Sequence, residues 1–336
     1  MRAIVYDRPG GSAVLRLVER EVPDPSPGEV RIRVVVSGVN PTDWKRRSTA
    51  EPGEEVTPNQ DGAGIVDRLG AGVDDLAVGD RVWLFLAQHE RPTGTAQEFT
   101  VLPRARVVRL PDAASFDAGA SLGVPALTAH RALTVGENAP ARLEPGSLAG
   151  ATVLVTGGAG AVGHAAIQLA RWAGASVIAT VSGPEKGELA RRAGAHHVVN
   201  YREGDPAATI RALAPDGVDT IVEVDVIGNR ELIAAVLRVG GAVAVYANSG
   251  TELTLPMRPF MALNARIQFV LLYGVDPDAL RAGVEDVTAA LAAGALPVGE
   301  EAGLPLIRFP LERTAEAHDA VERGAVGKVL IELTPS

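Results

Sequence analysis

The pattern of apolar and polar positions changes character about a third of the way along the chain. Up to about residue 122, short runs of β-forming residues alternate with segments rich in glycine and proline, such as residues 23–28. Short strands separated by turn signals are typical of a barrel-like β domain. The runs that we expect to form strands in this part are residues 31–36, 64–69, 80–85 and 98–101.

Beyond this point the apolar positions follow a helical period from residue 117 to 133, and strands then alternate with helices. Strict alternation of strand and helix predicts a parallel, doubly wound sheet. Two further strands, at 305–309 and 329–333, flank a helix at 312–323, and we expect this end of the chain to return to the first domain. The expected later elements are strands at 176–181, 198–200, 217–223, 241–246 and 267–272, and helices at 186–193 and 230–239.

These patterns predict an α/β chain of two domains. Residues 1–122 and 300–336 would form the catalytic or substrate domain, and residues 123–299 the dinucleotide-binding domain, with a cleft between the two. A chain of 336 residues is long enough for two domains that each have a core of their own.

A glycine-rich segment carries the clearest chemical signal. An apolar run at residues 153–156 precedes the glycines, and an alanine-rich helical segment follows them. Gly158, Gly160 and Gly163 fit the G-x-G-x-x-G pattern, which serves a tight turn, close approach of a pyrophosphate, and helix-strand packing. A strand, turn and helix without a ligand is the alternative, but the second strand arrives at the spacing of a βαβ unit and favours a dinucleotide.

The end of the second strand indicates which dinucleotide. NAD sites usually place a carboxylate there for the ribose hydroxyl, but this chain has Ser182, with Lys186 one turn later. A hydroxyl donor and a cation suit a 2'-phosphate, so we predict NADPH rather than NADH. The alternative is that Lys186 is a solvated helix residue, with Glu185 and Glu188 weakening the positive field.

Composition narrows the function classes. The net charge is −9, with 46% hydrophobic residues, which argues against a nucleic-acid surface. There are no cysteines, and therefore no disulfides, thiol nucleophiles or thiolate zinc sites. No signal peptide or membrane-length apolar run is evident, so we expect a soluble cytoplasmic protein.

The order of motifs resembles the medium-chain dehydrogenase/reductase superfamily, and within it the zinc-free quinone oxidoreductases of the zeta-crystallin type. The resemblance implies a GroES-like β-barrel domain joined to a Rossmann domain, and NADPH-dependent hydride transfer to a quinone or another conjugated carbonyl. The segments that carry it are residues 37–43, 61–64, 78–82, 123–129, 157–163, 194–201 and 327–329.

The same resemblance bears on metal chemistry. The positions that hold catalytic zinc in related alcohol dehydrogenases fall on Asn40, Gln60 and Val124, which do not make a zinc ligand set. We therefore expect no metal. A quinone or an activated double bond delocalises incoming charge itself, so its reduction does not depend on a Lewis acid.

The resemblance also implies the residues that bind the cofactor and those near the chemistry. Asn40, Asp43 and Lys45 are the predicted catalytic residues, although Asn40 is equally a turn residue before Pro41, and Lys45 replaces the tyrosine of many relatives. The predicted cofactor-binding residues are Gly158, Ala159, Gly160, Ala161, Val162, Gly163, Ser182, Lys186, Tyr201, Tyr246, Ala247, Asn248, Val270, Leu271, Leu272 and Arg323.

Two alternatives keep the fold but change the function. The chain could be an enoyl or enone reductase of a tailoring pathway, or a binding protein for NADPH without catalysis. An apolar strand at 267–272 at the edge of the sheet would pair with a second copy, so we also expect a homodimer.

Overall fold

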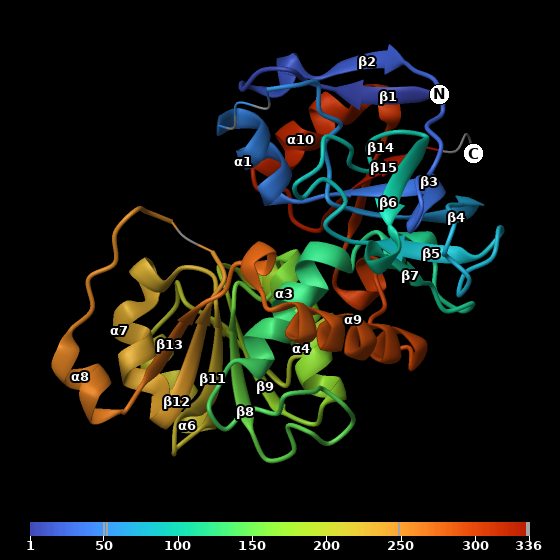
Figure 1. The fold of residues 1–336 in the computed structure, drawn as a ribbon. Helices are drawn as coiled ribbons and strands as arrows, with labels where there is room; N and C mark the ends of the chain where they lie inside the picture. Colours follow the sequence, from blue (N-terminus) through green and yellow to red (C-terminus); the bar gives the residue numbers. More distant parts are fainter. Residues whose placement is uncertain (50, 52, 248, 334–336) are drawn as a thin grey trace. The chain divides into compact units, whose positions relative to one another are not determined.

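The computed structural model describes residues 1–49, 51, 53–247 and 249–333. The chain divides into two compact units (Figure 1). Unit 1 consists of Met1–Val124 and Pro305–Ser336, and unit 2 of Pro125–Leu304.

Unit 1 is built on a sheet of seven strands, in the order β14-β15-β3-β4-β5-β7, with β6 pairing β3 as well. The C-terminal strand β15 pairs antiparallel with β3, so the end of the chain completes a sheet that begins near the N-terminus. A separate hairpin joins β1 and β2. The bounds are β1 Arg2–Val5, β2 Arg16–Glu19, β3 Glu29–Val39, α1 Pro41–Thr49, β4 Asp61–Leu69, β5 Arg81–Leu84, β6 Phe99–Pro103, β7 Val107–Arg109, α2 Phe116–Gly119, β14 Leu306–Pro310, α10 Thr314–Glu322 and β15 Lys328–Glu332.

Unit 2 is built on a six-stranded sheet in the order β10-β9-β8-β11-β12-β13, in which every pairing is parallel. The chain winds outward from β8 in both directions, and right-handed crossovers then place α4 and α7 on opposite faces. The predicted doubly wound sheet is confirmed. The bounds are α3 Gly123–Thr134, β8 Thr152–Thr156, α4 Ala161–Trp172, β9 Ser176–Val181, α5 Pro184–Arg192, β10 His197–Asn200, α6 Pro206–Leu213, β11 Val218–Glu223, α7 Val226–Val236, β12 Leu237–Val245, α8 Met257–Ala262, β13 Arg266–Phe269 and α9 Pro277–Ala292.

Several expected element bounds differ from the structure. The helical run expected at 117–133 forms two helices, α2 and α3, separated by residues 120–122. Two further differences have clear causes. The strand expected at 267–272 ends at Phe269, because its neighbour β12 ends at Val245 and offers no further partner after the bond from the Val270 N–H. The helix expected at 230–239 begins earlier, where the Asp225 side chain caps it. Its last three residues belong to β12, in which Leu237 pairs with Val218.

Candidate functional site

The predicted cofactor residues of unit 2 lie at one edge of its sheet. All six strands run in parallel, so the segments that follow them emerge at the same, carboxyl edge, which is where open α/β sheets bind ligands. Asn248 lies outside the described residues. The segments at this edge are 157–163 after β8, Ser182 and Lys186 after β9, Tyr201 after β10, Tyr246 and Ala247 after β12, and Val270, Leu271 and Leu272 after β13.

Arg323 lies elsewhere. It follows α10 in unit 1, its side chain is 72% exposed, and its nearest carboxylate is Asp319 at 3.9 Å. The structure therefore does not place it in the unit that carries the glycine loop, and its predicted role in cofactor binding stays a prediction.

The glycines of the loop after β8 have different structural roles. The tight turn is made by Gly157, which has a φ of 67° and directly precedes the three glycines of the pattern. At Gly158 a Cβ would lie 2.9 Å from the Ala179 Cβ, and at Gly163 it would lie 2.4 Å from the Gly157 carbonyl oxygen. Both positions therefore need glycine for packing within the chain.

Gly160 is different, because a Cβ there would meet only the Gly157 oxygen, at an ordinary 3.4 Å. The space beside Gly160 is open, as a closely approaching pyrophosphate requires. Gly160 is also the N-cap of α4 and has no side chain to cap the first free N–H groups of that helix. A phosphate fits this helix start, because the free N–H groups donate to it and the helix dipole favours its charge.

The end of β9 carries no acidic side chain. Ser182 follows the strand directly, and Lys186 lies in the first turn of α5, half-buried. Within the part of the chain that the structure describes, Lys186 forms no ion pair. Its charge is thus available to an anionic group at this edge.

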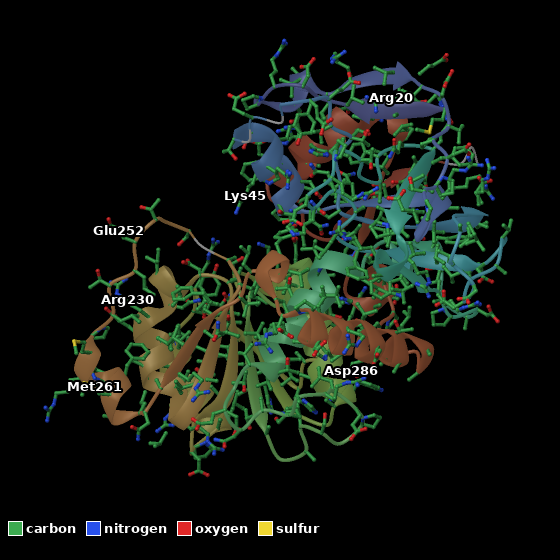
Figure 2. All side chains as sticks on the ribbon, in the orientation of Figure 1. Arg20, Lys45, Arg230, Glu252, Met261 and Asp286 are labelled. Carbon is green, nitrogen blue, oxygen red and sulfur yellow. The ribbon has the colours of Figure 1, made fainter. Side chains whose placement is uncertain are left out.

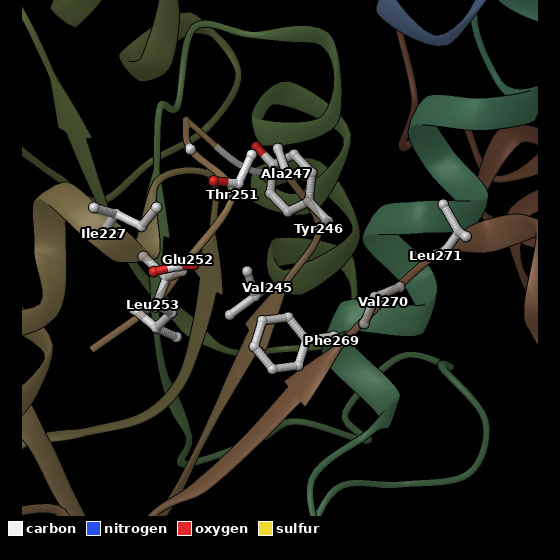
Figure 3. Close-up of a pocket in the computed structure, with 12 residues that line it drawn as sticks. Ile227, Val245, Tyr246, Ala247, Thr251, Glu252, Leu253, Phe269, Val270 and Leu271 are labelled. Carbon is white, nitrogen blue, oxygen red and sulfur yellow. The ribbon is translucent and has the colours of Figure 1, made fainter. Parts of the chain in front are cut away.

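An open pocket of about 450 Å³ lies at the carboxyl ends of β12 and β13 (Figure 3). Most of the side chains around it are apolar, and Tyr246 adds a phenol whose pKa is raised by burial, so that it stays neutral. The lining also includes the acidic Glu252, so the pocket suits an apolar molecule better than an anion. Its apolar and aromatic lining includes Ile227, Val245, Tyr246, Leu253, Phe269 and Val270.

Glu223, the last residue of β11, is a fully buried carboxylate at this edge that the sequence reasoning missed. Its Oε1 accepts hydrogen bonds from the Asp225 N–H at 2.5 Å and from Asn229 Nδ2 at 2.8 Å. Burial raises the pKa of Glu223, and Asn229, the Asp225 N–H and the nearby Thr156 hydroxyl oppose that rise. The available signal was an acidic residue between Val222 and Val224 at the end of an apolar run.

In unit 1 the predicted catalytic residues Asn40 and Asp43 belong to a buried network centred on Asp61. Asn40 Nδ2 donates to Asp61 Oδ2 at 2.7 Å, and Lys328 Nζ donates to Asn40 Oδ1 at 2.7 Å. The Val124 N–H donates to Asp61 at 2.9 Å, and Lys328 Nζ lies 3.7 Å from Asp61 Oδ2. Asp61 and Lys328 were not among the predicted residues, although both lie in motifs that the sequence analysis singled out.

Asp43 lies in the first turn of α1, and its Oδ2 accepts the Asn40 N–H at 2.7 Å. Burial raises the pKa of Asp43 to about 8, with the negative charge of Asp61 adding to the rise. Burial lowers the pKa of Lys328, which the charge of Asp61 opposes. Lys45 is exposed on the same helix (Figure 2). A catalytic role for Asn40, Asp43 and Lys45 stays a prediction.

The three positions that the resemblance equates with zinc ligands are held by hydrogen bonds within the chain. Asn40 and the Val124 N–H contact Asp61, while Gln60 Nε2 donates to Gln88 Oε1 at 3.3 Å. Among the described residues, no group of three or more histidine, cysteine or acidic side chains is arranged to hold a metal ion.

His164, in the first turn of α4, is buried and its Nε2 donates to the Ala302 carbonyl at 2.8 Å. Burial lowers its pKa to about 4. His164 therefore stays neutral at neutral pH and stabilises the packing of α4 against the segment at Ala302.

Comparisons with known proteins agree with this geometry. Residues 26–112 match the alcohol dehydrogenase GroES-like domain, and residues 161–289 match the zinc-binding dehydrogenase family. The quinone oxidoreductase of Rattus norvegicus is 34% identical, over 98% of this chain and 97% of the relative. A crystal structure of an NAD-dependent alcohol dehydrogenase has a TM-score of 0.86 at 27% identity, covering 99% of this chain and 100% of that one. A mycobacterial protein complexed with NADPH has a TM-score of 0.82 at 29% identity, with the same coverage.

A chain that contains a GroES-like unit and a Rossmann-type unit with a glycine loop has the composition of the medium-chain dehydrogenase/reductase class. Within this class the chain belongs to the quinone oxidoreductase-like family, as the sequence motifs predicted. In the described part of the chain, no helix has the length and apolar character needed to cross a membrane.

Proposed function

We propose that this chain transfers a hydride from NADPH to a quinone or another conjugated carbonyl acceptor, without zinc. The observation that carries the proposal is the carboxyl edge of unit 2. There an uncapped helix start with open space at Gly160 lies on the same sheet edge as a pocket lined by apolar side chains. The similarity to quinone oxidoreductases supports the oxidoreductase class.

The residues present fit a phosphorylated dinucleotide. The N–H groups at the start of α4 would hold the pyrophosphate, and Ser182 and Lys186 would bind a 2'-phosphate as hydroxyl donor and cation. The mycobacterial structure with NADPH supports this assignment. When bound, the cofactor supplies the hydride from its nicotinamide C4.

The pocket would bind and orient the acceptor. Side chains such as Val245, Phe269 and Val270 would exclude water and orient a planar acceptor, which raises the rate through positioning. The acceptor delocalises the incoming charge, and after hydride transfer the reduced quinone takes the one proton that it still needs from water. No side chain of this chain is assigned as a proton donor.

A panel of acceptors tests the proposal and separates it from its alternatives. NADPH oxidation would be followed with 1,4-benzoquinone, 9,10-phenanthrenequinone, an enone and an enoyl thioester, with and without a chelator. We expect the protein to reduce the quinones, at a rate that the chelator does not change. Turnover of the enone or the thioester alone would favour a double-bond reductase. Tight NADPH binding without turnover of any acceptor would favour a binding protein. Loss of activity with the chelator would overturn zinc independence.

We also propose a homodimer joined through β13. This strand lies at the edge of its sheet, and the exposed Phe269 and Leu271 side chains, 62% and 68% accessible, follow that edge. A free edge with apolar side chains favours pairing with a second copy. In sedimentation at micromolar concentration, the wild type should have twice the mass of one chain, and the Phe269→Lys variant should have the mass of one chain. A monomeric wild type would contradict the proposal.

A further inference from the structure

Glu223 lies at the one carboxyl strand end in unit 2 that the family resemblance left without a predicted residue. The described residues give its two oxygens unequal environments. Oε1 accepts from Asp225 and Asn229, while Oε2 is buried and accepts no hydrogen bond in the described part of the chain, because the neighbouring Thr156 hydroxyl donates to the Val222 carbonyl at 3.2 Å. A buried carboxylate oxygen without a donor is costly, and native proteins usually satisfy it with a bound group or water.

The surroundings of Glu223 connect it to both halves of the proposed site. Tyr246, which lines the apolar pocket, donates its backbone N–H to the Glu223 carbonyl at 3.1 Å. Val224, the next residue, donates its N–H to Thr156 Oγ1 at 2.9 Å, directly before the glycine loop. A Cβ on Gly157 would lie 3.0 Å from Val224. Glu223 is therefore held between the glycine loop and the pocket.

The strand order indicates which part of a dinucleotide reaches Glu223. The adenosine ribose is recognised at the end of the second strand, β9, and the pyrophosphate lies at the loop after β8. Since β11 flanks β8 on the side opposite β9, the other half of the molecule, the nicotinamide riboside, would extend toward β11 and β12.

From this placement we infer that Glu223 Oε2 accepts a hydrogen bond from the nicotinamide half of the bound dinucleotide. The donor is either the carboxamide N–H or a ribose hydroxyl. Glu223 thereby fixes the position of the nicotinamide ring beside the pocket. This inference rests on the proposed binding of a nicotinamide dinucleotide, but not on the preference for NADPH over NADH, because both share this half.

Glu223→Gln tests the inference with a side chain of the same shape. Two donors already point at Oε1, so the glutamine oxygen takes that position and its NH2 group replaces Oε2. The acceptor thus becomes a donor. We expect the Kd for NADPH, measured by its fluorescence, to rise about tenfold or more. The Kd for 2',5'-ADP, which lacks the nicotinamide half, should change less than twofold.

A cofactor analogue identifies the donor. The 3-acetylpyridine analogue of NADP has a methyl group in place of the carboxamide NH2. If the carboxamide is the donor, the wild type binds this analogue more weakly than NADP and the variant loses that discrimination. If a ribose hydroxyl is the donor, the variant weakens both dinucleotides by the same factor. Either pattern supports the inference.

Asp286→Asn is the matched control, since Asp286 is a buried carboxylate of unit 2 whose oxygens accept from His130, Arg142 and the Leu143 N–H (Figure 2). It should lower the melting temperature and leave both Kd values unchanged. Should Glu223→Gln not fold, Glu223→Asp, which keeps the charge but withdraws the oxygens, is expected to show the same selective loss.

Two results would overturn the inference alone. One is an unchanged Kd for NADPH in Glu223→Gln, as expected if only water contacts Oε2. The other is an equal loss for NADPH and 2',5'-ADP, which would indicate a structural role. A wild type that binds neither NADPH nor NADH would instead overturn the proposed function, and this inference with it.

Discussion

Asp61 in unit 1 and Glu223 in unit 2 are both fully buried carboxylates at strand ends, but their partners differ. Asp61 accepts from Asn40 and Val124 and lies near the Lys328 ammonium. Glu223 has donors on one oxygen only. Burial raises the pKa of both groups, so burial does not distinguish them. The chain itself satisfies the Asp61 carboxylate, whereas it leaves one oxygen of Glu223, at the carboxyl edge of the sheet, for the group that we infer binds there.

The largest expected effect comes from removing the satisfied carboxylate. Asp61→Leu leaves the buried Lys328 without its nearest charge partner, which should lower the free energy of unfolding of unit 1 by about 3–5 kcal/mol. Urea unfolding followed by the fluorescence of the buried Trp83 measures this.

The double variant Asp61→Leu with Lys328→Met is the control for that experiment. Because it removes both charges, it should cost less than the sum of the two single changes. Strict additivity would show that the pair has no energetic coupling, and would break the contrast with Glu223.

The next effect separates two glycines of one loop. Gly160→Val places a side chain in the open space where a pyrophosphate fits, so the Kd for NADPH should rise about a hundredfold while stability is nearly unchanged. Gly163→Ala instead puts a Cβ against the Gly157 carbonyl, and should lower stability by about 1–3 kcal/mol. Thermal unfolding and fluorescence titration of both variants check this, and equal losses of stability would contradict it.

A smaller effect should appear in the pH dependence of stability. The pKa of His164 is lowered to about 4 by burial, whereas the unfolded side chain takes up a proton near pH 6.5. The unfolded state thus binds more protons between these values, so stability falls as the pH drops from about 6.5 to 4.

His164→Gln keeps a donor for Ala302 but removes this titration. Between pH 7 and pH 5 the variant should lose about 2 kcal/mol less stability than the wild type. Like Asp61, His164 is satisfied by its own chain, so NADPH binding at pH 7 should hardly change. Chemical denaturation at the two pH values is the measurement, and parallel pH profiles would count against a neutral buried His164.

The smallest effect concerns cofactor choice. Lys186→Gln removes the cation near the end of β9, and the preference for NADPH over NADH, taken as the ratio of their Kd values, should fall about tenfold. Arg191→Gln on the same helix is the control, because Arg191 is exposed and already lies 3.6 Å from Glu188. An unchanged ratio in Lys186→Gln would show that Lys186 is only a solvated helix residue.

The local sequence pattern was enough to predict much of the fold of this protein. The alternation of strands and helices predicted the parallel sheet of unit 2, and the glycine pattern predicted where a dinucleotide would bind. Both depend on neighbours close in sequence, since a βαβ unit is nearly continuous and its loops follow the strand ends. Ser182, Lys186 and Tyr246 lie at the same edge of the sheet for a similar reason, because the carboxyl ends of parallel strands always meet at one edge.

The tertiary structure decided what depends on distant partners. Asn40, Asp61 and Lys328 are far apart in the sequence, and only folding shows that they form one buried network. Strand ends were misjudged for the same reason, since β13 stops where β12 no longer offers hydrogen bonds. The sequence by itself thus determined the class of fold and the sheet edge at which we expect the ligand to bind. Which buried charges are satisfied by the chain was decided by the tertiary structure, because hydrogen-bond partners are set by spatial contacts that no local pattern records.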